Sequence, residues 1–113
     1  MRLSAGEYLR AEQAMYQQCR RVLGWFADYD LLLCPTLPET ALPLGVLAGA
    51  GPAVWDRLES YIAFTFWGNM TGQPGISLPL ALAGDGLPIG VQLVGRQLAD
   101  RTVLSVAAQL EQA

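Results

Sequence analysis

Few residues of this chain have side chains that start hydrolytic or acid–base chemistry. Neither histidine nor lysine occurs among its 113 residues, and every cationic side chain is an arginine. A Ser-His-Asp triad and a Ser-Lys pair are therefore both excluded within this chain. We interpret the four serines as structural: Ser4 as a helix cap, Ser77 as a strand residue, and Ser60 and Ser105 as helix surface. The sequence thus predicts no catalytic residue.

Cysteines, acids and glycines form no metal or cofactor motif either. The spacing of Cys19 and Cys34 matches neither a redox pair nor a zinc knuckle. The acidic residues are dispersed, without the Asp-x-Asp-x-Asp-Gly pattern of a calcium loop. The glycine-rich stretch 45–51 lacks the Lys-Ser/Thr pair of a phosphate-binding loop. We therefore expect no metal and no cofactor.

Composition limits the classes of partner. Apolar residues make up 52% of the chain and charged residues 15%, so the chain is more apolar and less charged than an average soluble domain. Either a well-filled core or a surface that contacts a partner explains this excess of apolar residues. The net charge is −3 and no basic stripe is present, so we expect no nucleic-acid partner. No apolar run is long enough to span a membrane, and residues 1–7 lack an apolar signal core. We expect a cytoplasmic protein with reduced thiols.

The first half of the chain predicts a helix, a strand and a loop. Ser4 and Glu7 form a capping box, and helical periodicity follows it, so we expect a helix over residues 4–27. Residues 31–34 are a continuous apolar run, which is typical of a strand buried on both faces. Proline and glycine dominate residues 36–51, which predicts an irregular loop.

The second half predicts a helix, a hairpin and a last helix. A helix is expected over residues 53–69, strands over 75–82 and 88–95, and a final helix from Asp100 to about Leu110. The chain is therefore one α/β domain, with three helices packed on about three strands of a mixed sheet. At least one edge of so small a sheet stays open.

Two segments of the second half carry specific motifs, Asn69–Pro74 (NMTGQP) and Leu87–Gly95 (LPIGVQLVG). Both are similar to landmarks of the amidase signature family, whose members are serine hydrolases that cleave carboxamides. Residues 4–11, 26–38 and 100–111 resemble, in the same order, the helix before a late core strand, the exit of that strand, and the closing helix. The resemblance implies that residues 1–113 are a single partial domain, the C-terminal piece of an α/β/α sandwich.

The resemblance also implies what this chain lacks. The family's triad is a lysine, a bridging serine in a cis peptide and a nucleophilic serine in a Gly/Ser-rich stretch, all upstream of these landmarks. This sequence contains no lysine and no such stretch, so no catalytic residue can be assigned. We expect the chain to supply scaffold and pocket wall, without activity of its own.

By the same resemblance, five residues are expected to line the substrate pocket: Thr36, Leu37, Pro38, Trp67 and Asn69. Two of them have structural alternatives, because Asn69 can cap a turn with its side chain and Trp67 can be part of the core.

One position separates subfamilies. The tRNA amidotransferase subunit that belongs to the family has an aspartate where this chain has Ile62. The difference favours a general amidase, with an apolar pocket indicated by Phe64, Phe66 and Trp67.

Three hypotheses remain open. The chain is the C-terminal part of an amidase, or a free-standing binding or assembly module, or one subunit of a split amidase or amidotransferase. The expected partners are a small-molecule amide in the complete enzyme and either an N-terminal catalytic half or further copies of the chain.

Overall fold

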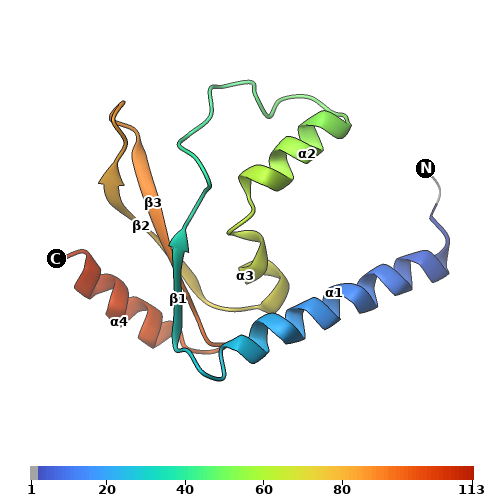
Figure 1. The fold of residues 1–113 in the computed structure, drawn as a ribbon, viewed down its shortest axis with the longest axis horizontal. Helices are drawn as coiled ribbons and strands as arrows, with labels where there is room; N and C mark the ends of the chain where they lie inside the picture. Colours follow the sequence, from blue (N-terminus) through green and yellow to red (C-terminus); the bar gives the residue numbers. More distant parts are fainter. Residues whose placement is uncertain (1–2) are drawn as a thin grey trace.

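The computed structural model describes residues 3–113 (Figure 1). Met1 and Arg2, part of the segment assessed for a signal peptide, lie outside the described residues. The elements are α1 (Ala5–Trp25), β1 (Leu31–Pro35), α2 (Pro52–Tyr61), α3 (Phe66–Thr71), β2 (Gly75–Leu82), β3 (Pro88–Gly95) and α4 (Asp100–Leu110). The predicted α/β class is confirmed, and so is the capping box at Ser4, which starts α1.

The helix expected over residues 53–69 is in fact two helices, so the structure has four helices instead of three. The break lies between Ile62 and Phe66. Thr65 donates from both its backbone nitrogen and its hydroxyl to the Ile62 carbonyl, each at 3.1 Å. Residues 62–66 are mostly β-branched or aromatic. Because such residues lose side-chain freedom in a helix, this segment favours a turn over a continued helix.

The three strands form a sheet in the order β1-β3-β2, and both neighbours of β3 are antiparallel to it. The expectation of a mixed sheet is therefore wrong for the described strands. A tight turn joins β2 to β3, with the Ala83 nitrogen donating to the Leu87 carbonyl at 2.8 Å. β1 takes the remaining edge of β3, so β1 and β2 point the same way without touching as neighbours.

β1 is more exposed than its apolar run predicted. Leu33 is 59% exposed and Leu32 is 37% exposed, whereas a strand buried on both faces was expected. The reason is position, because β1 is an edge strand and no strand lies outside it within residues 3–113.

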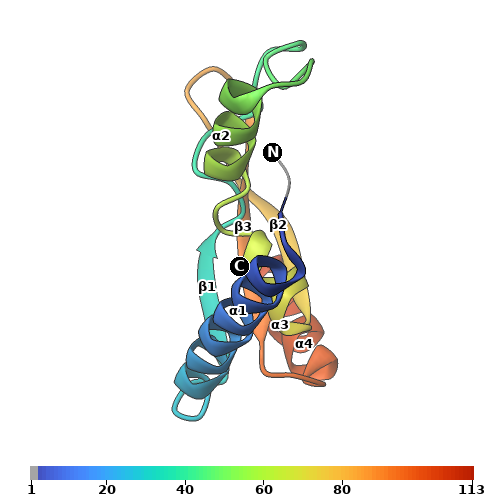
Figure 2. The ribbon, with the colours of Figure 1, turned by 90° about the vertical axis from the view of Figure 1, so that its right-hand side faces the viewer.

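The sheet separates the helices into two groups. In Figure 1, α4 lies on one side of the strands, and α1, α2 and α3 lie on the other; Figure 2 shows the same arrangement from the side of α1. The core on the α4 side is built from Leu78, Leu93, Val103 and Ala107, with Leu31, Ile76, Val106 and Leu110 packed around them.

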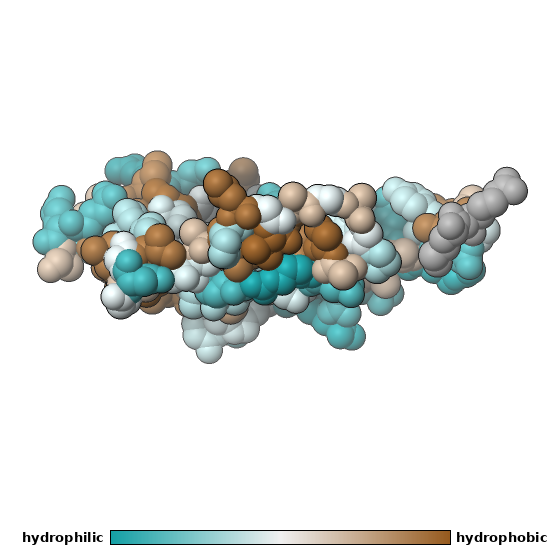
Figure 3. All heavy atoms as spheres, turned by 90° about the horizontal axis from the view of Figure 1, so that it is seen from above, coloured by the Kyte–Doolittle hydropathy of each residue, from teal (hydrophilic) through white to brown (hydrophobic). Residues whose placement is uncertain are grey.

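The chain is flat and open. Its radius of gyration is 16.9 Å, whereas a compact domain of this length has about 13 Å. Its accessible surface is 8268 Å², roughly 2,000 Å² more than a folded monomer of 12.2 kDa exposes. Apolar residues are exposed in several places on the face seen in Figure 3. The apolar composition therefore does not fill a core within residues 3–113, and much of it remains at the surface.

Gly95 allows α4 to approach the sheet closely. A Cβ added at Gly95 would lie 2.5 Å from the Val103 Cγ2 atom, which is too close for real atoms.

We expect Gly95→Ala to lower the free energy of unfolding by about 1–3 kcal/mol, because the added methyl overpacks the core. The matched control is Gly24→Ala in α1, where the new methyl meets nothing within 4 Å. Urea denaturation of both variants checks this, and equal midpoints would contradict it.

Candidate functional site

A polar row crosses the face of the sheet that is turned away from α4. Ser77, Gln92 and Cys34 lie opposite one another on β2, β3 and β1. The Gln92 side chain donates to the Phe64 carbonyl at 3.0 Å and to the Cys34 sulfur at 3.6 Å. Gln92 thereby ties the α2–α3 connection to the sheet. Burial raises the pKa of the Cys34 thiol, and the hydrogen bond from Gln92 opposes that rise.

Thr36 and Ser77 form a hydroxyl pair at the end of this row. The Thr36 Oγ1 and Ser77 Oγ atoms are 2.5 Å apart, and the Thr36 nitrogen donates to the Gly90 carbonyl at 2.8 Å. In such a pair one hydroxyl donates to the other, so the second keeps a proton for a third group. The pair can therefore donate one hydrogen bond to a bound acceptor.

Gly90 makes room for the hydroxyl pair. A Cβ at this position would lie 2.8 Å from Thr36 Oγ1 and 2.9 Å from Ser77 Oγ. Only a residue without a side chain leaves the two hydroxyls where they are.

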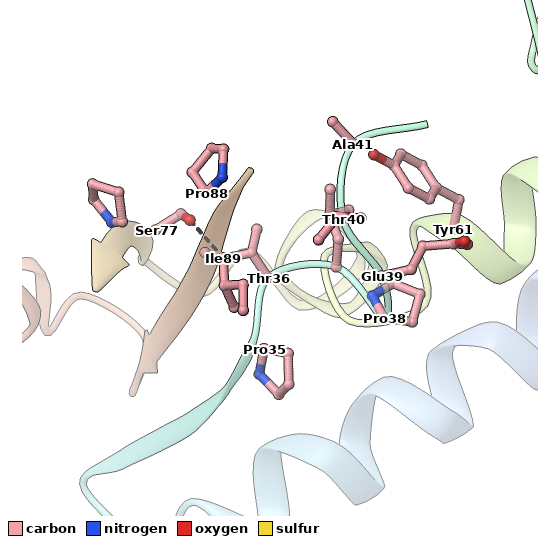
Figure 4. Close-up of a pocket in the computed structure, with 13 residues that line it drawn as sticks. Pro35, Thr36, Pro38, Glu39, Thr40, Ala41, Tyr61, Ser77, Pro88 and Ile89 are labelled. Carbon is pink, nitrogen blue, oxygen red and sulfur yellow. Dashed lines mark hydrogen bonds between the residues drawn. The ribbon is translucent and has the colours of Figure 1, made fainter. Parts of the chain in front are cut away.

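The hydroxyl pair lies on the wall of an open hollow with a volume of about 600 Å³, which we call the proline-rich hollow (Figure 4). It is lined by Pro35 at the end of β1, residues 36–41 of the following loop, Tyr61 at the end of α2, Ser77 and Pro79 of β2, and residues 88–90 of β3. In Figure 4 the Tyr61 ring lies beside Ala41, across the hollow from Ser77.

Two further hollows adjoin the same face of the sheet. The polar hollow, about 390 Å³, is lined by Thr36, Thr65, Gly68, Asn69, Gln73, residues 75–77, Gln92 and Val94. The aromatic hollow, about 330 Å³, is lined by Val22, Trp25, Phe26, Leu32, Cys34, Phe64, Trp67, Gln73 and Val94. Thr36 and Ser77 belong to both the proline-rich and the polar hollow, so these two join at the hydroxyl pair.

The structure brings most of the predicted pocket residues together. Thr36, Leu37 and Pro38 line the proline-rich hollow, and Asn69 lines the polar hollow that joins it at Thr36. Trp67 lines the aromatic hollow instead, which shares Gln73 and Val94 with the polar hollow. The roles of the five predicted residues toward a substrate stay predictions.

The turn after α3 is held without the Asn69 side chain. Gly72 ends α3 in the left-handed conformation, with φ 68°. The Gln73 amide donates to the Gly95 carbonyl at 2.7 Å, and the Thr71 hydroxyl donates to Gln73 Oε1 at 2.9 Å. No side-chain hydrogen bond of Asn69 is found among residues 3–113, so its side chain does not cap this turn. Asn69 lines the polar hollow.

Three residues of the site, Ser77, Tyr61 and Gly90, were not predicted from the sequence as parts of it. Ser77 was interpreted only as a strand residue, which is correct but incomplete. Its partner Thr36 is 41 positions away, and only the pairing of both strands with β3 brings the two together. Gly90, inside the Leu87–Gly95 motif, was the one available signal, because a glycine within a strand marks a close approach.

An ion pair holds the loop that forms the wall of the proline-rich hollow. The Arg57 guanidinium of α2 contacts both carboxylate oxygens of Glu39, each at 2.7 Å. The hydrogen bond from Arg57 lowers the pKa of the Glu39 carboxyl. Because the geometry is bidentate, it fixes the direction of the loop as well as its distance from α2.

Residues 3–113 contain no cluster of three metal-ligating side chains. In the same part of the chain, none of the helices has both the length and the apolar character needed to cross a membrane. The polar groups that line the hollows include the Thr36–Ser77 hydroxyl pair, the Glu39 carboxylate and the amides of Asn69 and Gln92.

Comparison with known sequences identifies the family. The family described as Amidase matches residues 1–104, and the chain belongs to this family. It is 42% identical over 95 residues to the protein named "Putative amidase AmiC" of Mycobacterium bovis, covering 83% of this chain and 20% of that protein. It is 38% identical over 117 residues to a glutamyl-tRNA(Gln) amidotransferase subunit of Parvibaculum lavamentivorans, covering 98% of this chain and 23% of the relative.

Solved structures agree with this family membership. The 6-aminohexanoate cyclic dimer hydrolase bound to its substrate superposes with a TM-score of 0.80 at 32% identity, covering 98% of this chain and 25% of that one. A glutamyl-tRNA(Gln) amidotransferase subunit of Thermotoga maritima gives a TM-score of 0.74 at 29% identity, with coverage of 90% and 21%. The chain thus spans about a fifth to a quarter of its relatives' length and corresponds to a C-terminal part of an amidase.

The resemblance to the amidase signature family is confirmed by these matches. The distinction drawn from Ile62 stays a prediction, because amidases and amidotransferase subunits match at similar identities.

Replacing Gly90 tests the hydroxyl pair. We expect Gly90→Ala to separate Thr36 from Ser77 and to destabilise the chain by about 1–3 kcal/mol, since the added methyl overpacks the site. Gly84→Ala is the control, because its new methyl meets nothing within 4 Å. Thermal unfolding and the NMR signals of the two hydroxyl-bearing residues provide the measurement. Unchanged signals in Gly90→Ala would show that the close approach is not real.

Acidification tests the ion pair. The pKa of Glu39 is lower in the folded chain than in the unfolded chain. The stability that the ion pair contributes is therefore complete above the unfolded pKa of about 4.3, and it is lost as the pH falls through the folded pKa. We expect NMR shifts of residues 39–41 and of Arg57 to change together below about pH 4.3. Glu39→Gln cannot titrate, so the same transition in that variant would contradict the assignment.

Proposed function

We propose that this chain forms scaffold and one wall of the substrate pocket in a hydrolase that cleaves carboxamide C–N bonds. The observation that carries the proposal is the Thr36–Ser77 hydroxyl pair. It lies where two hollows join, and Leu37, Pro38 and Asn69 also line these hollows. Membership of the amidase family supports an amide as the substrate class.

The reactive groups must come from outside this chain. Amide hydrolysis by a serine enzyme needs an activated nucleophile, a base and donors for the developing oxyanion. The chain has no lysine and no histidine to act as base. The Lys, bridging Ser and nucleophilic Ser of the amidase type therefore lie on the rest of the same polypeptide or on a second chain.

The wall contributes binding and orientation. The free proton of the hydroxyl pair can be donated to a carbonyl oxygen of the substrate. The apolar surfaces of Leu37, Pro38 and Tyr61 suit the uncharged body of a small linear amide. Trp67 is assigned to the wall through the family resemblance, and it acts from the neighbouring aromatic hollow.

A second candidate is one subunit of a split amidase or of an amidotransferase. The match to amidotransferase subunits favours it, whereas Ile62 in place of an aspartate favours a general amidase. A binding or assembly module without catalytic context is the third. Cytoplasmic location, self-association and the absence of nucleic-acid and membrane partners remain predictions from the sequence.

The direct test uses the purified chain and a complemented form. The 113-residue chain alone is expected to release no ammonia from primary amides and no amine from anilides. In the complemented form, the chain is co-expressed with 6-aminohexanoate cyclic dimer hydrolase from which the matching quarter has been removed. This combination is expected to hydrolyse amides. Hydrolysis by the chain alone would refute the assignment of the reactive groups to another part.

Variants of the hydroxyl pair test the wall. In the complemented enzyme, Thr36→Val is expected to raise KM by about 2- to 10-fold with little change in kcat, which is the effect of one lost hydrogen bond. Thr36→Ser keeps the hydroxyl and is the matched control. Equal KM values for the two variants would remove the proposed role of the pair.

A further inference from the structure

The helix α2 and the loop before it are weakly attached to the rest of the chain. No side chain of α2 is buried, and Trp55 on this helix is 61% exposed. Figures 1 and 2 show α2 apart from the sheet, from α1 and from α4. Within residues 3–113, the hydrogen bonds of residues 37–61 reach no residue outside the range 37–62. Packing and hydrogen bonds to the sheet therefore do not fix where this segment lies.

One side-chain contact closes this segment on itself. Arg57 and Glu39 are 18 positions apart, and they form the bidentate ion pair with contacts of 2.7 Å. Between them, Gly45 and Gly49 have φ angles of 92° and 107°, and a Cβ added at either would meet nothing within 4 Å. Because such glycines leave the backbone free to turn, the loop itself does not hold α2 in place. The ion pair fixes α2 relative to residues 37–41.

The width of the proline-rich hollow depends on this ion pair. Residues 36–41 and Tyr61, which follows Arg57 by one helical turn, line one side of the hollow. The other side is formed by Ser77, Pro79 and residues 88–90, which belong to the paired strands β2 and β3. One side is therefore held by the sheet, whereas the other is held by the ion pair.

Most of the groups that line the hollow are apolar. Four proline rings, those of Pro35, Pro38, Pro79 and Pro88, line it together with the ring of Tyr61. Its volume of about 600 Å³ lies within the range of small-molecule sites. An apolar pocket distinguishes substrates by the size of the group that it holds, because each added methylene must find contact without a clash. The distance between the two sides of the hollow thus decides which apolar groups fit.

We infer that Arg57 and Glu39 are positioning residues, whose ion pair fixes the width of the proline-rich hollow and so sets the largest apolar group that the complete enzyme accepts on its amide substrate. The pair acts through Tyr61 and residues 37–41, which line the hollow. This inference rests on the proposed function, because it takes the hollow as part of a substrate pocket.

The first measurement uses the chain alone and does not depend on catalysis. We expect Arg57→Met to lower the NMR order parameters of residues 40–50 from the value of a rigid backbone, about 0.85, to below about 0.6. Arg101→Met in α4 is the matched control, because Arg101 forms no ion pair within residues 3–113. The urea midpoint is expected to stay unchanged in both variants, since α2 buries no side chain.

The second measurement uses the complemented enzyme and primary amides of increasing acyl length, from acetamide to hexanamide. We expect Arg57→Met to raise the ratio of kcat/KM for hexanamide to that for acetamide by about two- to fivefold, the range that a partly exposed ion pair supports. The change arises in KM for hexanamide, whereas kcat for acetamide stays the same. The exchanged pair, Glu39→Arg combined with Arg57→Glu, is expected to restore the original ratio.

Three results would overturn the inference: unchanged order parameters in Arg57→Met, an unchanged ratio between the two amides, or an exchanged pair that fails to restore it. Hydrolysis of the whole series at an unchanged ratio leaves the proposed function intact and removes only the role of the ion pair. A complemented enzyme that hydrolyses no amide refutes the proposed function, and with it the role of the pair toward substrates, even where Arg57→Met loosens residues 40–50.

Discussion

The central strand β3 is the element on which the rest of the structure depends. It pairs with β1 on one edge and with β2 on the other. Leu93, between its ends, packs in the core against α4, whereas Gln92 and Gly90 face the opposite side. One strand therefore both anchors the core and builds the floor of the site, and a one-residue shift in its register would exchange the two.

The open shape follows from how little of the sheet is covered. One helix packs over the core, and the far face carries hollows instead of a closed layer. A structure of this kind gains only part of the burial that a compact domain of the same length achieves. Both the open shape and the family membership indicate that the chain is one part of a larger folded unit.

Local signals in the sequence predicted local structure well. The capping box at Ser4 and the hairpin between β2 and β3 need only neighbouring residues, and both are confirmed. The break after Ile62 was missed, because helical periodicity continues across it while Thr65 takes the Ile62 carbonyl. The exposure of Leu33 was also missed, because an apolar run does not reveal whether a neighbouring strand is present.

Residues of the candidate site were predicted only where they lie in a segment that resembles a family motif. Thr36 and Asn69 came from resemblance, whereas Ser77 depends on two strand pairings that no local pattern encodes. Glu39 and Arg57 are likewise joined across a proline- and glycine-rich loop whose path the sequence does not specify.

The central claim is that this chain completes an amide hydrolase whose reactive groups lie outside it. The most direct measurement is mass spectrometry of the polypeptide that contains these residues, purified from the cells that make it, with an amidase assay of the same sample. We expect active material in which these residues are joined to, or held by, a sequence that carries a lysine and a Gly/Ser-rich serine stretch. Amide hydrolysis by a sample that contains only the 12.2 kDa chain would contradict the claim.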